Sequence, residues 1–143
     1  MLYISDLSPA TSPTSIAEIL VNERKVCTCQ GLTGLLVFDG TRLIHFLEGD
    51  HPELAATVSR IESDDQRLGS NRLHYRSIVK RQFLSLGIGY WYVEDDSHVV
   101  RLRTLAGGPA IDAFLALRSE FQIVIDPVAA ATPSAPLPIT AQL

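Results

Sequence analysis

The sequence predicts an α+β fold in which one β-sheet carries two helices on the same face. Short β-rich stretches and two stretches with helical periodicity follow one another in the order β-α-β-β-α-β-β. The chain of 143 residues is long enough for one domain with a single core. This order of elements is typical of a ferredoxin-like, split β-α-β sandwich.

The first strand and the first helix lie at the N-terminal end. The stretch LYIS at 2–5 is rich in β-forming residues, and turn-forming residues follow it. Ser12 before Pro13 is typical of a helix start, and the helix is predicted from about 13 to 28. Its buried side is expected to carry three apolar residues and one polar residue at helical spacing: Ile16, Ile19, Leu20 and Glu23.

A β-hairpin is predicted after this helix. The stretches LTGLLVF at 32–38 and TRLIHFLEG at 41–49 are both apolar enough to be buried strands. The Asp39-Gly40 pair lies between them, and an Asp-Gly pair between two apolar runs is the strongest short signal for a hairpin turn.

A second helix and two further strands complete the predicted sheet. Asp50 is a candidate N-cap, and Glu53 would complete a capping box with it. The apolar stripe of this helix consists of Leu54, Val58 and Ile61, and the helix is predicted to end near 63–71. Two more strands are predicted in RLHYRSIVK at 72–80 and FLSLGIGYWYV at 83–93.

Both faces of the hairpin are apolar. In its second strand, Leu43 and Leu47 share one face, and His45 lies between them on that face. Ile44 and Phe46 lie on the opposite face, which two helices on one side of the sheet would leave in water. A further element of the chain or a partner subunit must therefore cover it.

Composition divides the chain into three segments. Residues 1–93 form the predicted sheet domain, 94–122 a C-terminal helical extension, and 123–143 a tail rich in Pro and Ala. The amphipathic stretch 109–122 is predicted to form a helix on the open sheet face. The tail has a composition typical of disorder. If the tail is nevertheless ordered to its end, it needs a surface to lie on, and a small domain has little surface to spare. On this ground we expect a homo-oligomer.

Charge and motifs argue against several classes of function. The formal net charge is −4 and no basic stripe is present, so no nucleic-acid partner is expected. No apolar run is long enough to span a membrane, and the N-terminal residues lack the pattern of a signal peptide. We therefore expect a cytoplasmic protein. No nucleophile with a base and an orienting group is evident, and no enzymatic activity is expected.

The two cysteines do not suggest a disulfide or a metal site. Cys27 and Cys29 are too close in sequence to form an unstrained disulfide. Together with His45 they would supply only three ligands, whereas structural zinc sites use four. No metal is expected.

Four short stretches resemble the BLUF family, sensors of blue light that bind FAD. They are YIS at 3–5, LTGLL at 32–36, FLEG at 46–49 and IVKRQF at 78–83. The resemblance covers about residues 1 to 93. It implies that FAD is the cofactor, and that its isoalloxazine ring lies between the two helices, over the sheet.

Several residues match the flavin site of that family. The family's photochemistry begins at a tyrosine of the first strand, where this chain has Tyr3. Two branched apolar residues, one on each helix, clamp the ring, and Ile19 and Ile61 stand at these positions. Both positions would also face the sheet in an ordinary core. Arg60 and Arg67 could meet a cofactor phosphate, although solvated charges at a helix C-terminus are the commoner explanation.

Other positions depart from the family pattern. The glutamine that switches hydrogen bonds around the ring is replaced by His45, and the asparagine near the end of the first helix by Cys27. In the last strand, Leu86 and Ile88 stand where the family usually has a tryptophan or small residue and then a methionine. A neutral imidazole offers one donor and one acceptor but cannot interchange them by rotation as an amide does.

Two functions therefore remain open from the sequence. The first is a flavin-binding blue-light photoreceptor with altered photochemistry, which signals to an unidentified partner protein. The second is a flavin-free, BLUF-like interaction module. The matching Tyr3 and isoleucines favour the first, and the replacements at Cys27 and His45 favour the second.

Overall fold

The computed structural model describes residues 1–64, 72–91, 101–102, 104–105 and 107–127. The N-terminal elements are β1 (Leu2–Asp6), α1 (Pro13–Cys29), β2 (Thr33–Phe38), β3 (Arg42–Glu48) and α2 (His51–Glu62). They are followed by β4 (Arg72–His74), β5 (Leu86–Tyr90), α4 (Gly108–Ala116), a 3₁₀ turn (Arg118–Glu120) and β6 (Gln122–Ile125).

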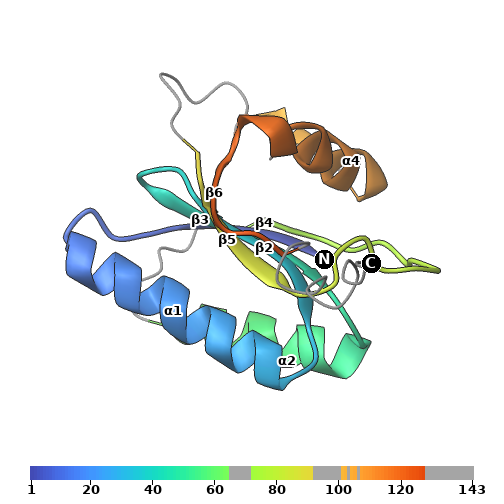
Figure 1. The fold of residues 1–143 in the computed structure, drawn as a ribbon, viewed down its shortest axis with the longest axis horizontal. Coiled ribbons are helices and arrows are strands. Elements are labelled where there is room, and N and C mark those ends of the chain that lie inside the picture. Colours follow the sequence, from blue (N-terminus) through green and yellow to red (C-terminus); the bar gives the residue numbers. More distant parts are fainter. Residues whose placement is uncertain (65–71, 92–100, 103, 106, 128–143) are drawn as a thin grey trace, which may run out of the picture.

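The strands form one six-stranded sheet in the order β4-β1-β3-β2-β5-β6. β2 and β5 are parallel, and all other neighbours are antiparallel. Helices α1 and α2 lie on one face of the sheet, and α4 lies on the other (Figure 1). The predicted α+β, ferredoxin-like order is confirmed, and the helix predicted to cover the second face does so.

Local sequence signals explain the ends of α1 and α2. The Ser12 hydroxyl accepts a hydrogen bond from the Ser15 N–H at 3.1 Å, so Ser12 caps α1 as expected. Asp50 occupies the N-cap of α2, but its side chain makes no cap hydrogen bond. The capping box predicted from Asp50 and Glu53 is therefore not formed.

The hairpin depends on two glycines with positive φ. Gly40 has φ 106° in the predicted turn, where Asp39 Oδ1 accepts hydrogen bonds from the backbone N–H groups of Thr41 and Arg42. Gly34 in β2 has φ 141°, and a Cβ there would lie 1.9 Å from the carbonyl oxygen of Phe46. The glycine of the LTGLL stretch is required because β3 passes too close for any side chain.

The sheet separates two apolar clusters. The first lies between the sheet and the helices α1 and α2, and includes Leu43 and Leu47 of β3. The second lies between the sheet and α4, and includes Ile44 and Phe46. The alternation predicted along β3 is thus confirmed, and Ile111 and Phe114 of α4 are buried over Ile44 and Phe46 as expected.

Three predicted boundaries are wrong. The strand expected at 72–80 is limited to β4, and the described part of the strand expected at 83–93 is limited to β5. The helix expected to reach residue 122 ends at Ala116, and Gln122–Ile125 form β6, which was not predicted. β6 is a short edge strand that forms through its non-local pairing with β5. It therefore carries little signal in its own sequence, and the Pro/Ala-rich residues after it suggest a disordered tail. Most of the predicted tail lies outside the described residues.

Candidate functional site

The sequence-predicted site residues come from five elements and meet between the sheet and the two helices. The structure places Tyr3 on β1, Ile19 and Cys27 on α1, His45 on β3, Ile61 on α2 and Ile88 on β5. All of these residues are buried except Ile19, which is half-buried. All but His45 belong to the first apolar cluster or pack against it. Arg67 lies outside the described residues.

Tyr3 and His45 are direct neighbours in the sheet. Their Cα atoms are register partners between β1 and β3, and both side chains point to the helix-covered face. The ring centroids are 6.5 Å apart with the ring planes nearly perpendicular at 88°. The Tyr3 hydroxyl donates a hydrogen bond to Glu62 Oε2 at 3.4 Å. The tyrosine and the residue at the family's glutamine position are therefore brought together.

His45 contacts a buried carboxylate on α1. Its Nε2 atom lies 3.1 Å from Oε2 of Glu23. Both side chains are buried, with 0% of His45 and 6% of Glu23 exposed. A buried carboxylate is rarely left without partners, because it loses the solvation that water provides. Here the imidazole is one of those partners.

Arg60 of α2 is the second partner of Glu23. Its Nη1 atom donates to Oε1 of Glu23, so the ion pair connects α2 to α1. Its Nη2 atom lies 3.7 Å from the Sγ atom of Cys27. The guanidinium turns inward to α1, so Arg60 is not simply a solvated charge at the helix C-terminus.

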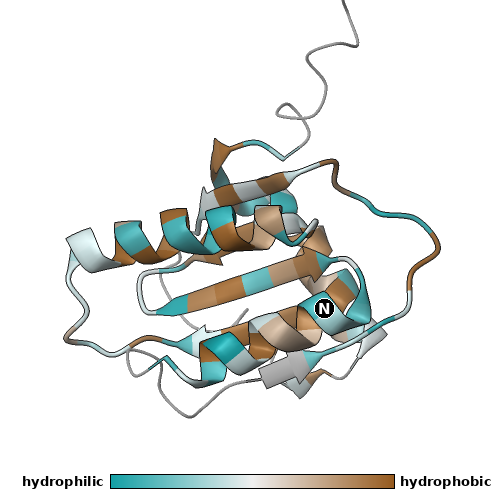
Figure 2. Ribbon diagram, turned by 90° about the horizontal axis from the view of Figure 1, so that it is seen from below, coloured by the Kyte–Doolittle hydropathy of each residue, from teal (hydrophilic) through white to brown (hydrophobic). Residues whose placement is uncertain are grey.

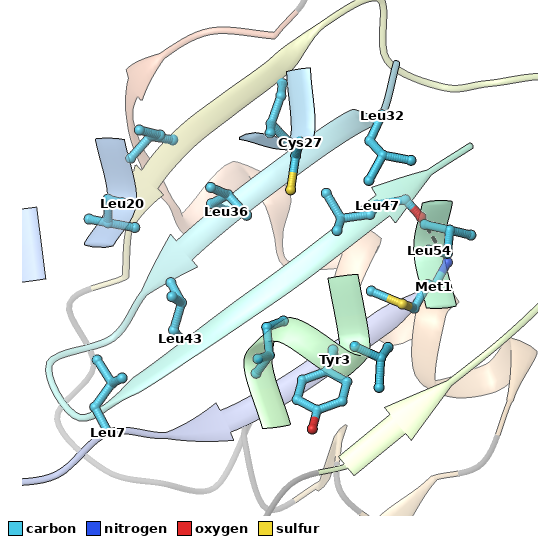
Figure 3. Close-up of a cluster of buried hydrophobic side chains, with 14 residues drawn as sticks. Met1, Tyr3, Leu7, Leu20, Cys27, Leu32, Leu36, Leu43, Leu47 and Leu54 are labelled. Atoms are coloured by element: carbon cyan, nitrogen blue, oxygen red, sulfur yellow. Dashed lines mark hydrogen bonds between the residues drawn. The ribbon is translucent and has the colours of Figure 1, made fainter. Parts of the chain in front are cut away.

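Cys27 lies at the centre of this site. Figure 3 shows its sulfur atom pointing from α1 into the apolar cluster, between Leu36 and Leu47. Burial and the negative charge of Glu23 raise the pKa of the Cys27 thiol to about 11. Cys27 is therefore a neutral thiol at physiological pH and a poor hydrogen-bond donor.

The charge state of Glu23 is set by its partners. Burial alone would raise the pKa of the Glu23 carboxyl, but the hydrogen bond and charge of His45, together with Arg60, lower this pKa to about 2. Glu23 is therefore ionised across the physiological range. The site is therefore built around a fixed negative charge.

Sequence reasoning missed the role of Glu23, although one signal was present. Glu23 was the only polar residue in the series that forms the buried side of the first helix. A charged residue on such a face needs a buried partner. Neither His45 nor Arg60 is close to it in the sequence, so the partners could only be found in the tertiary structure.

A second carboxylate, that of Glu48, connects two of the stretches that resemble the BLUF family. Glu48 at the end of β3 accepts hydrogen bonds from the backbone N–H groups of Gln82 at 2.6 Å and Phe83 at 3.0 Å. It also accepts one from the Thr33 hydroxyl at 3.1 Å. The FLEG stretch is thus tied to the IVKRQF stretch.

A family model for BLUF, described as sensors of blue-light using FAD, matches residues 1–89. This match spans more than half of the chain. The chain belongs to the BLUF family. BLUF domains are sensory and are not enzymes in themselves. No curated protein sequence matches the chain closely enough to count as a relative.

Solved BLUF structures share the fold. BlsA in its photo-activated state is 17% identical with a TM-score of 0.63, over 80% of this chain and 89% of that one. BlrB in its dark state is 18% identical with a TM-score of 0.58, over 82% of this chain and 92% of that one. Klebsiella pneumoniae BlrP1, in a complex with calcium and cyclic diGMP, is 23% identical with a TM-score of 0.53. The match covers 82% of this chain but 32% of BlrP1.

The chemistry of this site suits a flavin, with one condition. The isoalloxazine ring has apolar faces, for which Ile19 and Ile61 are available on the facing helices. Its polar edge carries carbonyl and ring-nitrogen acceptors and one N–H donor. His45 can supply a hydrogen-bonding group to such an edge. The condition is that the Glu23–Arg60 pair, which crosses the space between the helices, must part.

The described part of the chain lacks two further features. No helix there is both long enough and apolar enough to cross a membrane. Among the same residues, no group of three or more His, Cys, Asp or Glu side chains is arranged to hold a metal ion.

Proposed function

We propose that this chain is a BLUF photoreceptor domain that binds FAD between α1 and α2 and passes a light signal to a partner protein. The observation that carries the proposal is the position of Tyr3 beside His45, at the buried centre of the helix-covered face. In that arrangement Tyr3 lies next to His45, which stands where the family has the glutamine that switches its hydrogen bonds. Ile61 and Ile19 approach the same space from the two helices.

The cofactor supplies the light absorption and accepts an electron after excitation. Tyr3 is the electron donor in this proposal, because donation requires only that its ring lie close to the flavin. Its hydroxyl already donates to Glu62, so a carboxylate is in place for the phenolic proton. His45 takes the place of the relay amide, and Glu23 holds the imidazole in one orientation.

His45 is expected to change the outcome of the photocycle. An amide can rotate to exchange its donor and acceptor, whereas an imidazole held by Glu23 cannot do so without losing that contact. Cys27 offers little support to the ring's carbonyl edge. The proposal is therefore that the native chain binds FAD but forms no stable red-shifted signalling state.

Absorption spectroscopy tests this proposal directly. The native chain and the double variant His45→Gln with Cys27→Asn would be reconstituted with FAD and measured before and after blue light. We expect a bound flavin in both, and a reversible red shift only in the double variant. A matched control is His51→Gln with Cys29→Asn, because both of these residues are exposed.

Two outcomes would contradict the proposal. A native chain that gives the ordinary reversible red shift would show that His45 can replace the amide. A native chain that retains no FAD at any concentration would leave the flavin-free interaction module as the function. The comparisons with known proteins lend no support to that second function.

The partner and the assembly belong to the same proposal. The structural neighbours include Klebsiella pneumoniae BlrP1 in its cyclic diGMP complex and a bacterial light-regulated adenylyl cyclase, and we propose a downstream signalling protein as the partner here. A cytoplasmic location is part of this proposal. A homo-oligomer is supported by the edge strand β6, where Val124 is 59% exposed. Sedimentation that shows only monomer at micromolar concentration would contradict the homo-oligomer.

A further inference from the structure

The only direct ion pair described between α1 and α2 is that of Glu23 with Arg60. Glu23 also contacts His45 on β3, and Arg60 also contacts the Cys27 thiol. One carboxylate thus joins both helices and the sheet, at the place where the proposed flavin lies. Figure 2 looks onto this side of the molecule and shows a strand between the two helices.

On α1, Glu23 of the ion pair shares one helix face with the clamping isoleucine. Ile19 lies four residues before Glu23 on α1, and residues four apart in a helix are neighbours on one face. On α2, Ile61 is buried in the same cluster, and the neighbouring Arg60 points to another side of the helix but reaches across to Glu23 through its long side chain. A planar ring held between Ile19 and Ile61 must therefore compete with the Glu23–Arg60 pair for the space that this pair crosses.

Exposure indicates which of the two partners moves. The Arg60 side chain is 31% exposed, whereas the Glu23 side chain is 8% exposed and is also held by His45. A long arginine side chain with access to solvent can turn outward and regain hydration. Glu23 has no comparable path, because it lies on the buried side of α1.

We propose that Glu23 is a positioning residue of the flavin site, which holds Arg60 across the space between α1 and α2 and closes it until flavin binds. This inference rests on the proposed function. Flavin binding is then coupled to the release of Arg60 from Glu23. A ligand that binds only an open minority of the molecules has an apparent affinity lowered by the closed fraction. The pair therefore weakens the binding of FAD while it stabilises the flavin-free protein.

This pairing of effects gives the inference a distinctive test. The variants are Arg60→Met, which keeps the apolar stem, and Glu23→Gln, which removes the charge. Glu18→Gln is the control, because Glu18 lies on the exposed side of α1. The dissociation constant for FAD would be measured by calorimetry, and the melting temperature of each flavin-free protein by scanning calorimetry.

We expect opposite signs in the two measurements. Each site variant should bind FAD at least about tenfold more tightly than the native chain, and each should melt at a lower temperature without flavin. In a double-mutant cycle on the flavin-free protein, the two changes should be non-additive, because they break the same contact. Glu18→Gln should change neither quantity. Arg60 is partly exposed, so Arg60→Met serves if Glu23→Gln does not fold.

The contrary outcomes separate this inference from the proposed function. If the native chain binds FAD as tightly as the site variants, or more tightly, the closing role of Glu23 is wrong and FAD binding stands. If neither the native chain nor any variant binds FAD at saturating concentrations, both the inference and the proposed function are wrong. Additive effects in the cycle would also overturn the inference.

Discussion

The two faces of the sheet are packed by different kinds of side chain. Under α4, an unbroken series of aromatic rings crosses the cluster, with centroid distances between 5.3 and 5.9 Å: Phe83, Phe46, Phe114, Phe121 and Trp91. Under α1 and α2, the apolar cluster surrounds a buried carboxylate, an imidazole and a thiol. The same strand, β3, contributes Phe46 to one face and His45 to the other.

This difference separates stability from function. A buried ion pair is often no more stabilising than apolar side chains of the same volume, because both charges lose their hydration. The aromatic face shows that this sequence can fill a face with apolar side chains alone. The charged residues of the helix-covered face are therefore better explained by a binding role than by stability.

Removal of the segment that covers the aromatic face should have the largest effect. Truncation after Asp95 deletes α4 and β6 and exposes Ile44 and Phe46, whose burial is worth on the order of 3–6 kcal/mol. We expect aggregation or loss of cooperative unfolding, measured by solubility and by calorimetry against the full chain. A soluble truncated protein with an unchanged melting curve would mean that α4 does not stabilise the sheet.

A single ring of the aromatic face should have the next largest effect. Phe114 is 1% exposed and contacts both Phe46 and Phe121, so Phe114→Ala should destabilise the protein by about 3–5 kcal/mol. Urea unfolding measures this free energy. The control is Val124→Ala at a position 59% exposed, for which we expect a change within about 0.5 kcal/mol. Equal effects of the two changes would contradict the described packing.

The charged face should show a pH dependence that the aromatic face lacks. The pKa of Glu23 is lowered from 4.5 to about 2, so its contribution is fully present above pH 4.5 and is lost as the pH falls toward 2. This contribution is on the order of 3 kcal/mol. Unfolding curves between pH 2 and pH 7 should show a smaller acid loss for Glu23→Gln than for the native chain. An identical acid limb in both would contradict the ionised, paired state of Glu23.

The smallest effect is expected for the two cysteines under alkylation. Cys29 is exposed, whereas Cys27 is buried and its pKa is raised to about 11. Because the thiolate is the reactive form, iodoacetamide should label the folded chain once, at Cys29, and leave its stability unchanged. Peptide mass spectrometry identifies the labelled residue. Rapid labelling of Cys27 in the folded chain would mean that the space between α1 and α2 opens readily.

Most of the fold could be predicted because its signals are local. The Asp39-Gly40 turn, the Ser12 cap and the alternation along β3 each depend on residues that are adjacent in the sequence. β6 could not be predicted, because a four-residue edge strand depends on its pairing with β5 and carries little signal of its own. The end of α4 at Ala116 was also missed, because the residues after it lead into β6, and that strand carries little local signal.

The positions of the candidate site residues followed from the family resemblance, but their interactions did not. The resemblance aligned Tyr3, Cys27, His45 and the two isoleucines with known roles. It gave no role to Glu23, which is the residue that contacts His45 at 3.1 Å. The register of β1 against β3 and the approach of α2 to α1 decide that contact.

The sequence alone determined the order of the elements, the two apolar faces of the hairpin, and the replacement of an amide by the His45 imidazole. Only the tertiary structure decided what His45 contacts. His45 and Arg60 lie 22 and 37 residues along the chain from Glu23, whose carboxylate they share. Periodicity places each of them on a helix or strand, but electrostatic pairing acts across space, and the packing of α1, α2 and β3 sets those distances.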